Sequence, residues 1–146
     1  MERKMRIVIA NPWIDGLEER KPDHDAEEIA LALREDGMDV IADLECRYTP
    51  EQIVELSELE NADCLVVRVR QGLYCHPWFA ELMPLLRAHC ADDVLVIGCG
   101  FVPDSESSKL LETGVAKVFM PDSMITELSE YIKNNIGIYN QKSRKC

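Results

Sequence analysis

Two arginines stand at alternate positions after an apolar run, in the segment "CLVVRVR" that ends at Arg70. Because strand side chains alternate between two faces, Arg68 and Arg70 are predicted to point to the same side. Paired guanidinium groups can hold a phosphate or a carboxylate through several parallel hydrogen bonds. The other interpretation is internal pairing with acids such as Asp15, Glu18 or Asp104, because a buried arginine needs a partner.

Histidine and cysteine residues form a second group of candidates. His24 lies in the acidic segment "KPDHDAE". Further sulfur and imidazole groups expected in loops at the same edge of a sheet are Cys46, Cys75, His76 and Cys99. This set would suit zinc or another transition metal. Apart from the adjacent Cys75 and His76 it lacks zinc-ligand spacing, so His24 is interpreted first as a loop residue among acids.

The segment "GCG", Gly98 to Gly100, precedes an expected helix and raises the question of a phosphate loop. It lacks the lysine of a P-loop and the full dinucleotide fingerprint. Asp15 and Asp43 alone do not make a phospho-acceptor receiver domain, because the paired acids and the lysine of that class are missing. The sequence also shows no pattern of a serine or cysteine nucleophile with its base. No catalytic set is therefore predicted.

Bulk composition limits the classes of partner. The 146 residues are 47% hydrophobic and 29% charged, which suits one soluble domain spanning residues 1–146. The net charge of -11 argues against binding nucleic acid or anionic membranes. No signal peptide or 20-residue apolar span is visible, and the six cysteines are scattered, so we expect reduced thiols and a cytoplasmic protein.

Hydrophobic periodicity predicts five strands that alternate with five helices. The expected strands are 6–10, 40–44, 64–69, 94–97 and 115–119. The expected helices are 26–35, 50–60, 76–90, 105–112 and 125–134, followed by a polar tail at about 137–146. Thr49 and Gln52 suggest a capping box, and Pro84 could kink the third helix. The aromatic residues that open this helix, Tyr74, Trp78 and Phe79, are predicted to serve the core or an interface.

Alternating strands and helices predict the α/β class, with right-handed crossovers and one five-stranded parallel sheet between helices on both faces. Five units of this length favour the flavodoxin-like (Rossmann-type) order 2-1-3-4-5. Ligands of such sheets bind beyond the carboxyl ends of the strands. The loops expected there are 11–25, 45–49, 70–76, 98–105 and 120–124.

Several segments in order resemble the cobalamin (B12)-binding domain of methylmalonyl-CoA mutase and its small-subunit relatives. "RIVIANPWIDG" resembles the first strand and the start of the aspartate-x-histidine-x-x-glycine loop. "ALREDGMDVI" and "YTPEQIVELSELENADCLVV" are similar to the first helix, second strand and second helix. "DDVLVIGCGFVPDSE" and "ETGVAKVFMPDS" resemble the last two strands and their turns. The resemblance implies a domain that binds cobalamin.

The first loop departs from the family at the cobalt ligand. Asp15 and Gly16 match, but Leu17 stands where the family has the histidine that coordinates cobalt from below. Leucine has no lone pair to offer a metal. The loop is also about five residues longer than the family's when it is aligned from the following helix. His24 falls in the extension and matches the ligand position from neither side.

The other contact positions are altered as well. Arg68 and Arg70 flank Val69 where the family has serine-x-leucine around the nucleotide tail, and Cys99 adds a side chain between two glycines. The last turn, glycine-rich in the family, contains Pro121. Each change fills space or adds charge. Together they argue against the usual base-off, histidine-on binding.

The resemblance implies a non-catalytic binding or partner subunit, similar to the B12-binding part of methylmalonyl-CoA mutase. Any corrinoid would be bound without the usual histidine, and the expected partner is a mutase-type catalytic subunit or a second copy. The alternative is a regulatory or interaction protein with a decayed corrin site, in which Arg68 and Arg70 hold an anionic ligand or an acidic partner. A Cys/His metal-site protein is the third alternative.

Overall fold

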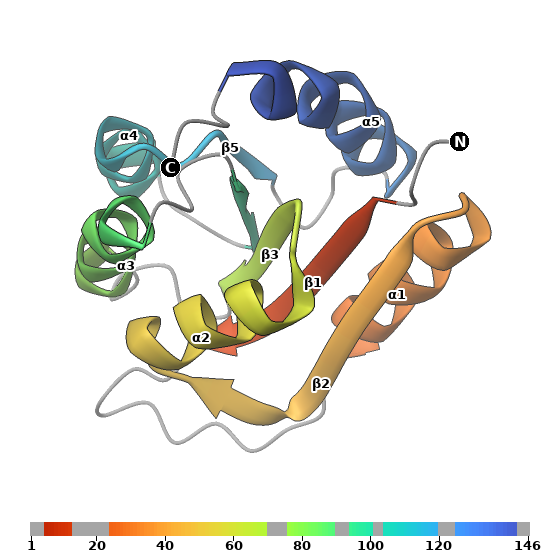
Figure 1. The fold of residues 1–146 in the computed structure, drawn as a ribbon, viewed down its shortest axis with the longest axis horizontal. Coiled ribbons are helices and arrows are strands. Elements are labelled where there is room, and N and C mark those ends of the chain that lie inside the picture. Colours follow the sequence, from red (N-terminus) through yellow and green to blue (C-terminus); the bar gives the residue numbers. More distant parts are fainter. Residues whose placement is uncertain are drawn as a thin grey trace.

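Parallel strands form one five-stranded sheet in the order β2-β1-β3-β4-β5, as predicted (Figure 1). The computed structural model describes residues 5–12, 24–69, 76–89, 94–100, 104–119 and 125–142. The strands are β1 (Arg6–Pro12), β2 (Asp39–Tyr48), β3 (Cys64–Val69), β4 (Leu95–Gly100) and β5 (Lys117–Phe119). The helices are α1 (His24–Glu35), α2 (Pro50–Glu60), α3 (His76–Ala88), α4 (Asp104–Thr113) and α5 (Ile125–Lys142).

Helices cover both faces of the sheet, with α1 and α5 on one side and α2, α3 and α4 on the other (Figure 1). Alternate residues of each central strand therefore contribute to different cores. The core beneath α1 and α5 includes Ile7, Ile9, Val66, Ile97, Leu33 and Ile132. The core beneath α2, α3 and α4 includes Val8, Ala10, Val67, Val96, Phe79 and Leu110. Strands covered on both faces explain the continuous apolar runs in the sequence.

The second helix begins with the capping box that the sequence predicts. The Thr49 hydroxyl accepts a hydrogen bond from the Gln52 backbone N–H at 3.2 Å, and the Gln52 side chain accepts one from the Thr49 N–H at 3.0 Å. These two bonds satisfy two N–H groups that the start of a helix would otherwise leave without partners. At the other end, Asn61, with a φ of 52°, terminates the helix in the left-handed conformation.

Element boundaries differ from the sequence prediction at several places: β1 ends at Pro12, for example, and β5 begins at Lys117. Three of the differences have a clear physical cause. The helix expected from residue 26 begins at His24, so the assignment of His24 to a loop is wrong; acids beside it favour a helix start. Strand β2 continues to Tyr48, because a register shift between Ile9 and Asn11 lets it pair further along β1. Helix α5 continues to Lys142, past the start of the expected polar tail, because one interior glycine weakens a helix without ending it.

Pro84 lies inside α3, which continues past it to Ala88, and a kink at this residue stays a prediction. The "GCG" segment differs from the expectation: it belongs to β4 and does not form a turn after it, because Gly98, Cys99 and Gly100 pair with Val67, Arg68 and Val69 of β3. This difference matters for function. It gives Cys99 the fixed direction of a strand residue.

Candidate functional site

Three polar side chains lie in one row across the carboxyl ends of the central strands. Ala10 of β1 pairs with Val67 of β3, so the next residues, Asn11 and Arg68, are neighbours. Arg68 in turn pairs with Cys99 of β4. By alternation these side chains follow Ile9, Val66 and Ile97 on the face beneath α1 and α5. We refer to Asn11, Arg68 and Cys99 as the polar row.

Arg68 is the cation of the polar row, and its residue is only 6% exposed. Its Nη1 donates to the Cys99 carbonyl oxygen at 3.1 Å and lies 3.4 Å from the Cys99 sulfur. A buried charge without hydrogen bonds would be costly, and these contacts supply partners for it. The guanidinium is therefore anchored across the sheet on β4. Arg70, Asp15 and Glu18 lie outside the described residues, so the predicted pairing of the two arginines stays a prediction.

Asn11 contributes an acceptor to the polar row. The residue is 5% exposed, and its Oδ1 is buried without a hydrogen-bond partner among the described residues. Most buried side-chain oxygens in native proteins have a partner, so such an atom needs an explanation. No sequence motif marks Asn11 as a candidate. The available signal was its place as the first polar residue after Ile7 and Ile9 on the same strand face.

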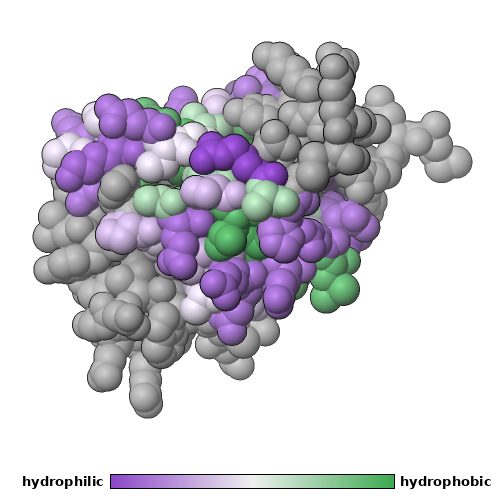
Figure 2. Space-filling view, turned by 60° about the vertical axis from the view of Figure 1, so that its left-hand side comes forward, coloured by the Kyte–Doolittle hydropathy of each residue, from purple (hydrophilic) through white to green (hydrophobic). Residues whose placement is uncertain are grey.

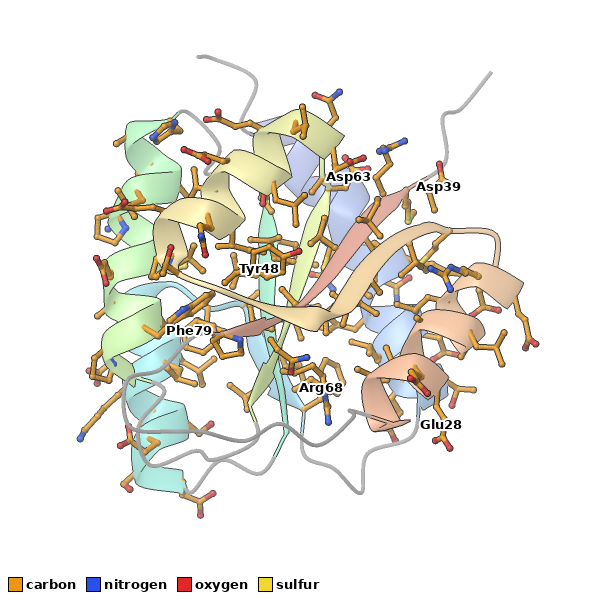
Figure 3. The ribbon with its side chains drawn as sticks, turned by 90° about the horizontal axis from the view of Figure 1, so that it is seen from below. Glu28, Asp39, Tyr48, Asp63, Arg68 and Phe79 are labelled. Atoms are coloured by element: carbon orange, nitrogen blue, oxygen red, sulfur yellow. The ribbon has the colours of Figure 1, made fainter. Side chains whose placement is uncertain are left out.

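Gly98 lies on the opposite face from the polar row. A Cβ built there would meet Val118 Cγ2 at 3.6 Å and Phe79 Cζ at 3.9 Å, which are ordinary contacts. Figure 3 shows Phe79 and Arg68 on opposite sides of β3, with Asp63 near its other end. Gly98 therefore packs beneath α3. Gly100, the last residue of β4, has a φ of 152°, where L side chains are unfavourable.

Aromatic packing holds α3 against the same edge of the sheet. Trp78 Nε1 donates to the Tyr48 carbonyl oxygen at 3.0 Å and joins α3 to the end of β2. The rings of Trp78 and Phe79 are 5.3 Å apart and nearly perpendicular. Both residues are buried, which confirms their predicted core role. Tyr74 lies outside the described residues.

The predicted metal set is only partly described. His24 is the first residue of α1 and His76 the first of α3. Cys46 and Cys99 were expected in loops, but they lie within β2 and β4. Within the described ranges, no group of three or more His, Cys, Asp or Glu residues could hold a metal ion. Cys64 and Cys99 are buried and are not in disulfides. The side chain of His24 is outside the description, as are Asp15, Gly16, Leu17, Cys75 and Pro121.

On the side that carries α3 and α4, the described residues expose little apolar area. Figure 2 brings this side forward and shows mainly hydrophilic residues with small hydrophobic areas. Among the residues whose side chains are described, the exposed large apolar ones are Leu31 of α1, Leu59 of α2 and Leu111 of α4. They lie on different helices. Among the described segments, no helix is long and apolar enough to cross a membrane.

Known proteins with similar sequences are acyl-CoA mutases or their small subunits. The chain is 32% identical to the 2-hydroxyisobutanoyl-CoA mutase small subunit of Aquincola tertiaricarbonis, over 91% of this chain and 93% of that subunit. It is 30% identical to the pivalyl-CoA mutase small subunit of Xanthobacter autotrophicus, over 97% of this chain and 88% of that subunit. It is 29% identical to ethylmalonyl-CoA mutase of Cereibacter sphaeroides, but spans only 20% of that enzyme. No protein-family model matches the chain.

Solved structures with the same arrangement of strands agree on the fold. A cobalamin-binding protein of Desulfitobacterium hafniense superposes with a TM-score of 0.70 at 15% identity, over 90% of this chain and 59% of that one. A CheY-like receiver domain of Methanospirillum hungatei superposes with a TM-score of 0.69 at 15% identity, over 96% of this chain and 99% of that one. The chain is thus a flavodoxin-like α/β domain with its candidate site at the carboxyl edge. It belongs to the cobalamin (B12)-binding domain family, in the form of the small subunits of acyl-CoA mutases.

Proposed function

We propose that this chain is the corrinoid-binding, non-catalytic subunit of an acyl-CoA mutase and acts with a larger catalytic subunit. The observation that carries this proposal is the extent of the matches. They cover 93% and 88% of two small subunits but only 20% of a complete mutase. Most of the complete enzyme, including the part that would handle the substrate, therefore has no counterpart in this chain. In such enzymes the bound corrinoid supplies the radical chemistry.

We further propose that the corrinoid binds without a histidine from the first loop and with its nucleotide tail outside the polar row. Leu17 occupies the aligned ligand position. Arg68 stands at the position of the family's tail-contacting serine, and its Nη1 is bound to the backbone and sulfur of Cys99. A neutral ring placed there would break these contacts of a buried guanidinium and offer it no acceptor in exchange. The residues of this chain therefore favour contacts with the corrin ring over contacts with a buried nucleotide tail.

Titration with hydroxocobalamin and adenosylcobalamin in the dark tests the proposal. We expect a saturable change in the visible spectrum, a rise in melting temperature, and a spectrum without histidine ligation. The His24→Ala variant should bind corrinoid like the wild type, as should His89→Ala, a matched change at an exposed histidine after α3. No spectral change and no rise in melting temperature would reject corrinoid binding. A histidine-ligated spectrum lost only in His24→Ala would identify His24 as the lower ligand.

The role as a partner subunit is tested separately. Size-exclusion chromatography of the chain mixed with a mutase-type catalytic subunit should show a complex, and the mixture should isomerise an acyl-CoA that neither protein converts alone. The alternative of an anion-binding regulatory protein predicts another result. Inorganic phosphate or citrate would then raise the melting temperature while the corrinoids have no effect.

A further inference from the structure

Within the polar row, Asn11 has a buried side-chain oxygen that lacks a hydrogen-bond donor from the described part of the chain. Its Oδ1 is buried without a partner among the described residues, although Arg68 stands beside it in the sheet. Arg68 Nη1 points to Cys99 on the far side. Burial of an acceptor without a donor opposes folding. Buried polar groups that break local rules of packing often belong to functional sites.

The two ends of an amide narrow the chemistry of the group that would satisfy Asn11. Oδ1 needs a donor, so a carboxylate or a fully ionised phosphate, which only accepts, would leave it unpaired. Rotation of the Asn11 amide by a half turn would place Nδ2 there, and that atom needs an acceptor. A primary carboxamide offers both a donor and an acceptor. It can form two parallel hydrogen bonds with an asparagine in either orientation.

We infer that Asn11 binds a carboxamide arm of the ligand, and that the polar row forms a subsite for this amide. The inference rests on the proposed corrinoid function, because a corrin ring carries primary carboxamides along its rim. It extends that function by naming the residue and the ligand group that meet. The guanidinium of Arg68 adds positive charge beside the carbonyl oxygen of such an arm. Arg68 keeps its contacts with Cys99 when the arm binds.

The Asn11→Leu variant tests this inference with two measurements. Leucine has a similar size and no polar atom, so the melting temperature of the ligand-free protein should stay unchanged or rise. Affinity for hydroxocobalamin should fall about tenfold or more, because the bound arm loses its partner. Ser57→Ala is the matched control. It removes another buried polar group, whose hydroxyl donates to the Ile53 carbonyl at 2.7 Å, and should leave corrinoid affinity unchanged.

Cobalamin derivatives with one amide arm hydrolysed to a carboxylate identify the ligand group. One of these monocarboxylic acids should bind the wild type more weakly than hydroxocobalamin does, and Asn11→Leu should lose that preference. Asn11→Asp, which cannot donate to the arm, provides a second variant if Asn11→Leu does not fold, and its affinity should also fall.

The outcomes separate this inference from the proposed function. If the wild type binds no corrinoid, the proposed function fails and the inference fails with it. If the wild type binds and the Asn11 variants bind equally well, the inference alone is overturned. If ligand-free Asn11→Leu melts at a lower temperature than the wild type and Asn11→Asp binds hydroxocobalamin as tightly as the wild type, Asn11 serves only the folded structure, which also overturns the inference.

Discussion

The guanidinium of Arg68 in β3 is bound to Cys99 in β4, with 3.1 Å from Nη1 to the carbonyl oxygen and 3.4 Å to the sulfur. This contact crosses two central strands at the edge where ligands of this fold bind. It places a buried positive charge where the family resemblance implies a small neutral residue. The contact therefore links the stability of the sheet to the form of ligand that the edge can accept.

The first prediction concerns this contact. Arg68→Ala should lower the free energy of unfolding by about 1–3 kcal/mol, because it removes a buried group together with its contacts to Cys99. Urea denaturation followed by circular dichroism measures the change. Arg87→Ala, at an exposed position near the end of α3, should stay within about 0.5 kcal/mol of the wild type. Equal effects of the two substitutions would contradict a structural role for the Arg68 contact.

Much of the fold could be predicted because its causes are local. A strand covered on both faces must be apolar throughout, so "CLVVRV" identified β3 without knowledge of its neighbours. The capping box at Thr49 and Gln52 depends on residues three apart and was likewise visible. The strand order followed from the alternation of strands and helices together with the handedness of crossovers.

The rest depends on contacts between distant segments. The extension of β2 requires the register shift against β1, which no window of the β2 sequence contains. The polar row requires Asn11, Arg68 and Cys99 to be in step across three strands, and their separation in sequence hides this. The "GCG" segment resembles a turn when it is considered alone. Pairing with β3 makes it part of a strand.

A second prediction separates the two glycines of β4. Gly98→Ala should change stability by less than about 0.5 kcal/mol, because the added Cβ meets Val118 and Phe79 at ordinary distances. Gly100→Ala should destabilise by about 1–3 kcal/mol, because a residue with a φ of 152° is strained once it carries a Cβ. Thermal denaturation of both variants provides the measurement. Loss of corrinoid affinity in Gly98→Ala would contradict the assignment of Gly98 to the α3 side.

A third prediction concerns the start of α2. Thr49→Ala should lower the free energy of unfolding by about 1 kcal/mol, because the Gln52 N–H loses its acceptor. Gln52→Ala should lower the free energy of unfolding by less than Thr49→Ala does. The double variant should lose less than the sum of the two single losses, because the two hydrogen bonds belong to one motif. Urea denaturation of the three variants measures this. Ser108→Ala, at an exposed position inside α4, provides the control, and an equal loss of stability there would contradict a capping effect.

The last prediction concerns stability at alkaline pH. Burial, and then the charge of Asp63, raise the pKa of the Cys64 thiol far above its ordinary value of 9.0. The folded protein therefore keeps this proton at a pH where the unfolded chain releases it. The stability that the thiol contributes is complete below about pH 9 and decreases above it, by up to about 1.4 kcal/mol per pH unit.

Cys64→Ala isolates this contribution, because the other groups that titrate in this range are common to both proteins. The variant should be less stable at pH 7 owing to the lost buried sulfur, yet its stability should decrease less steeply between about pH 9 and pH 10.5. Urea denaturation at several pH values measures both slopes. Parallel slopes would show that Cys64 ionises equally easily in both states. The same burial predicts that Cys64 reacts with a thiol reagent only after unfolding, because the reactive species is the thiolate.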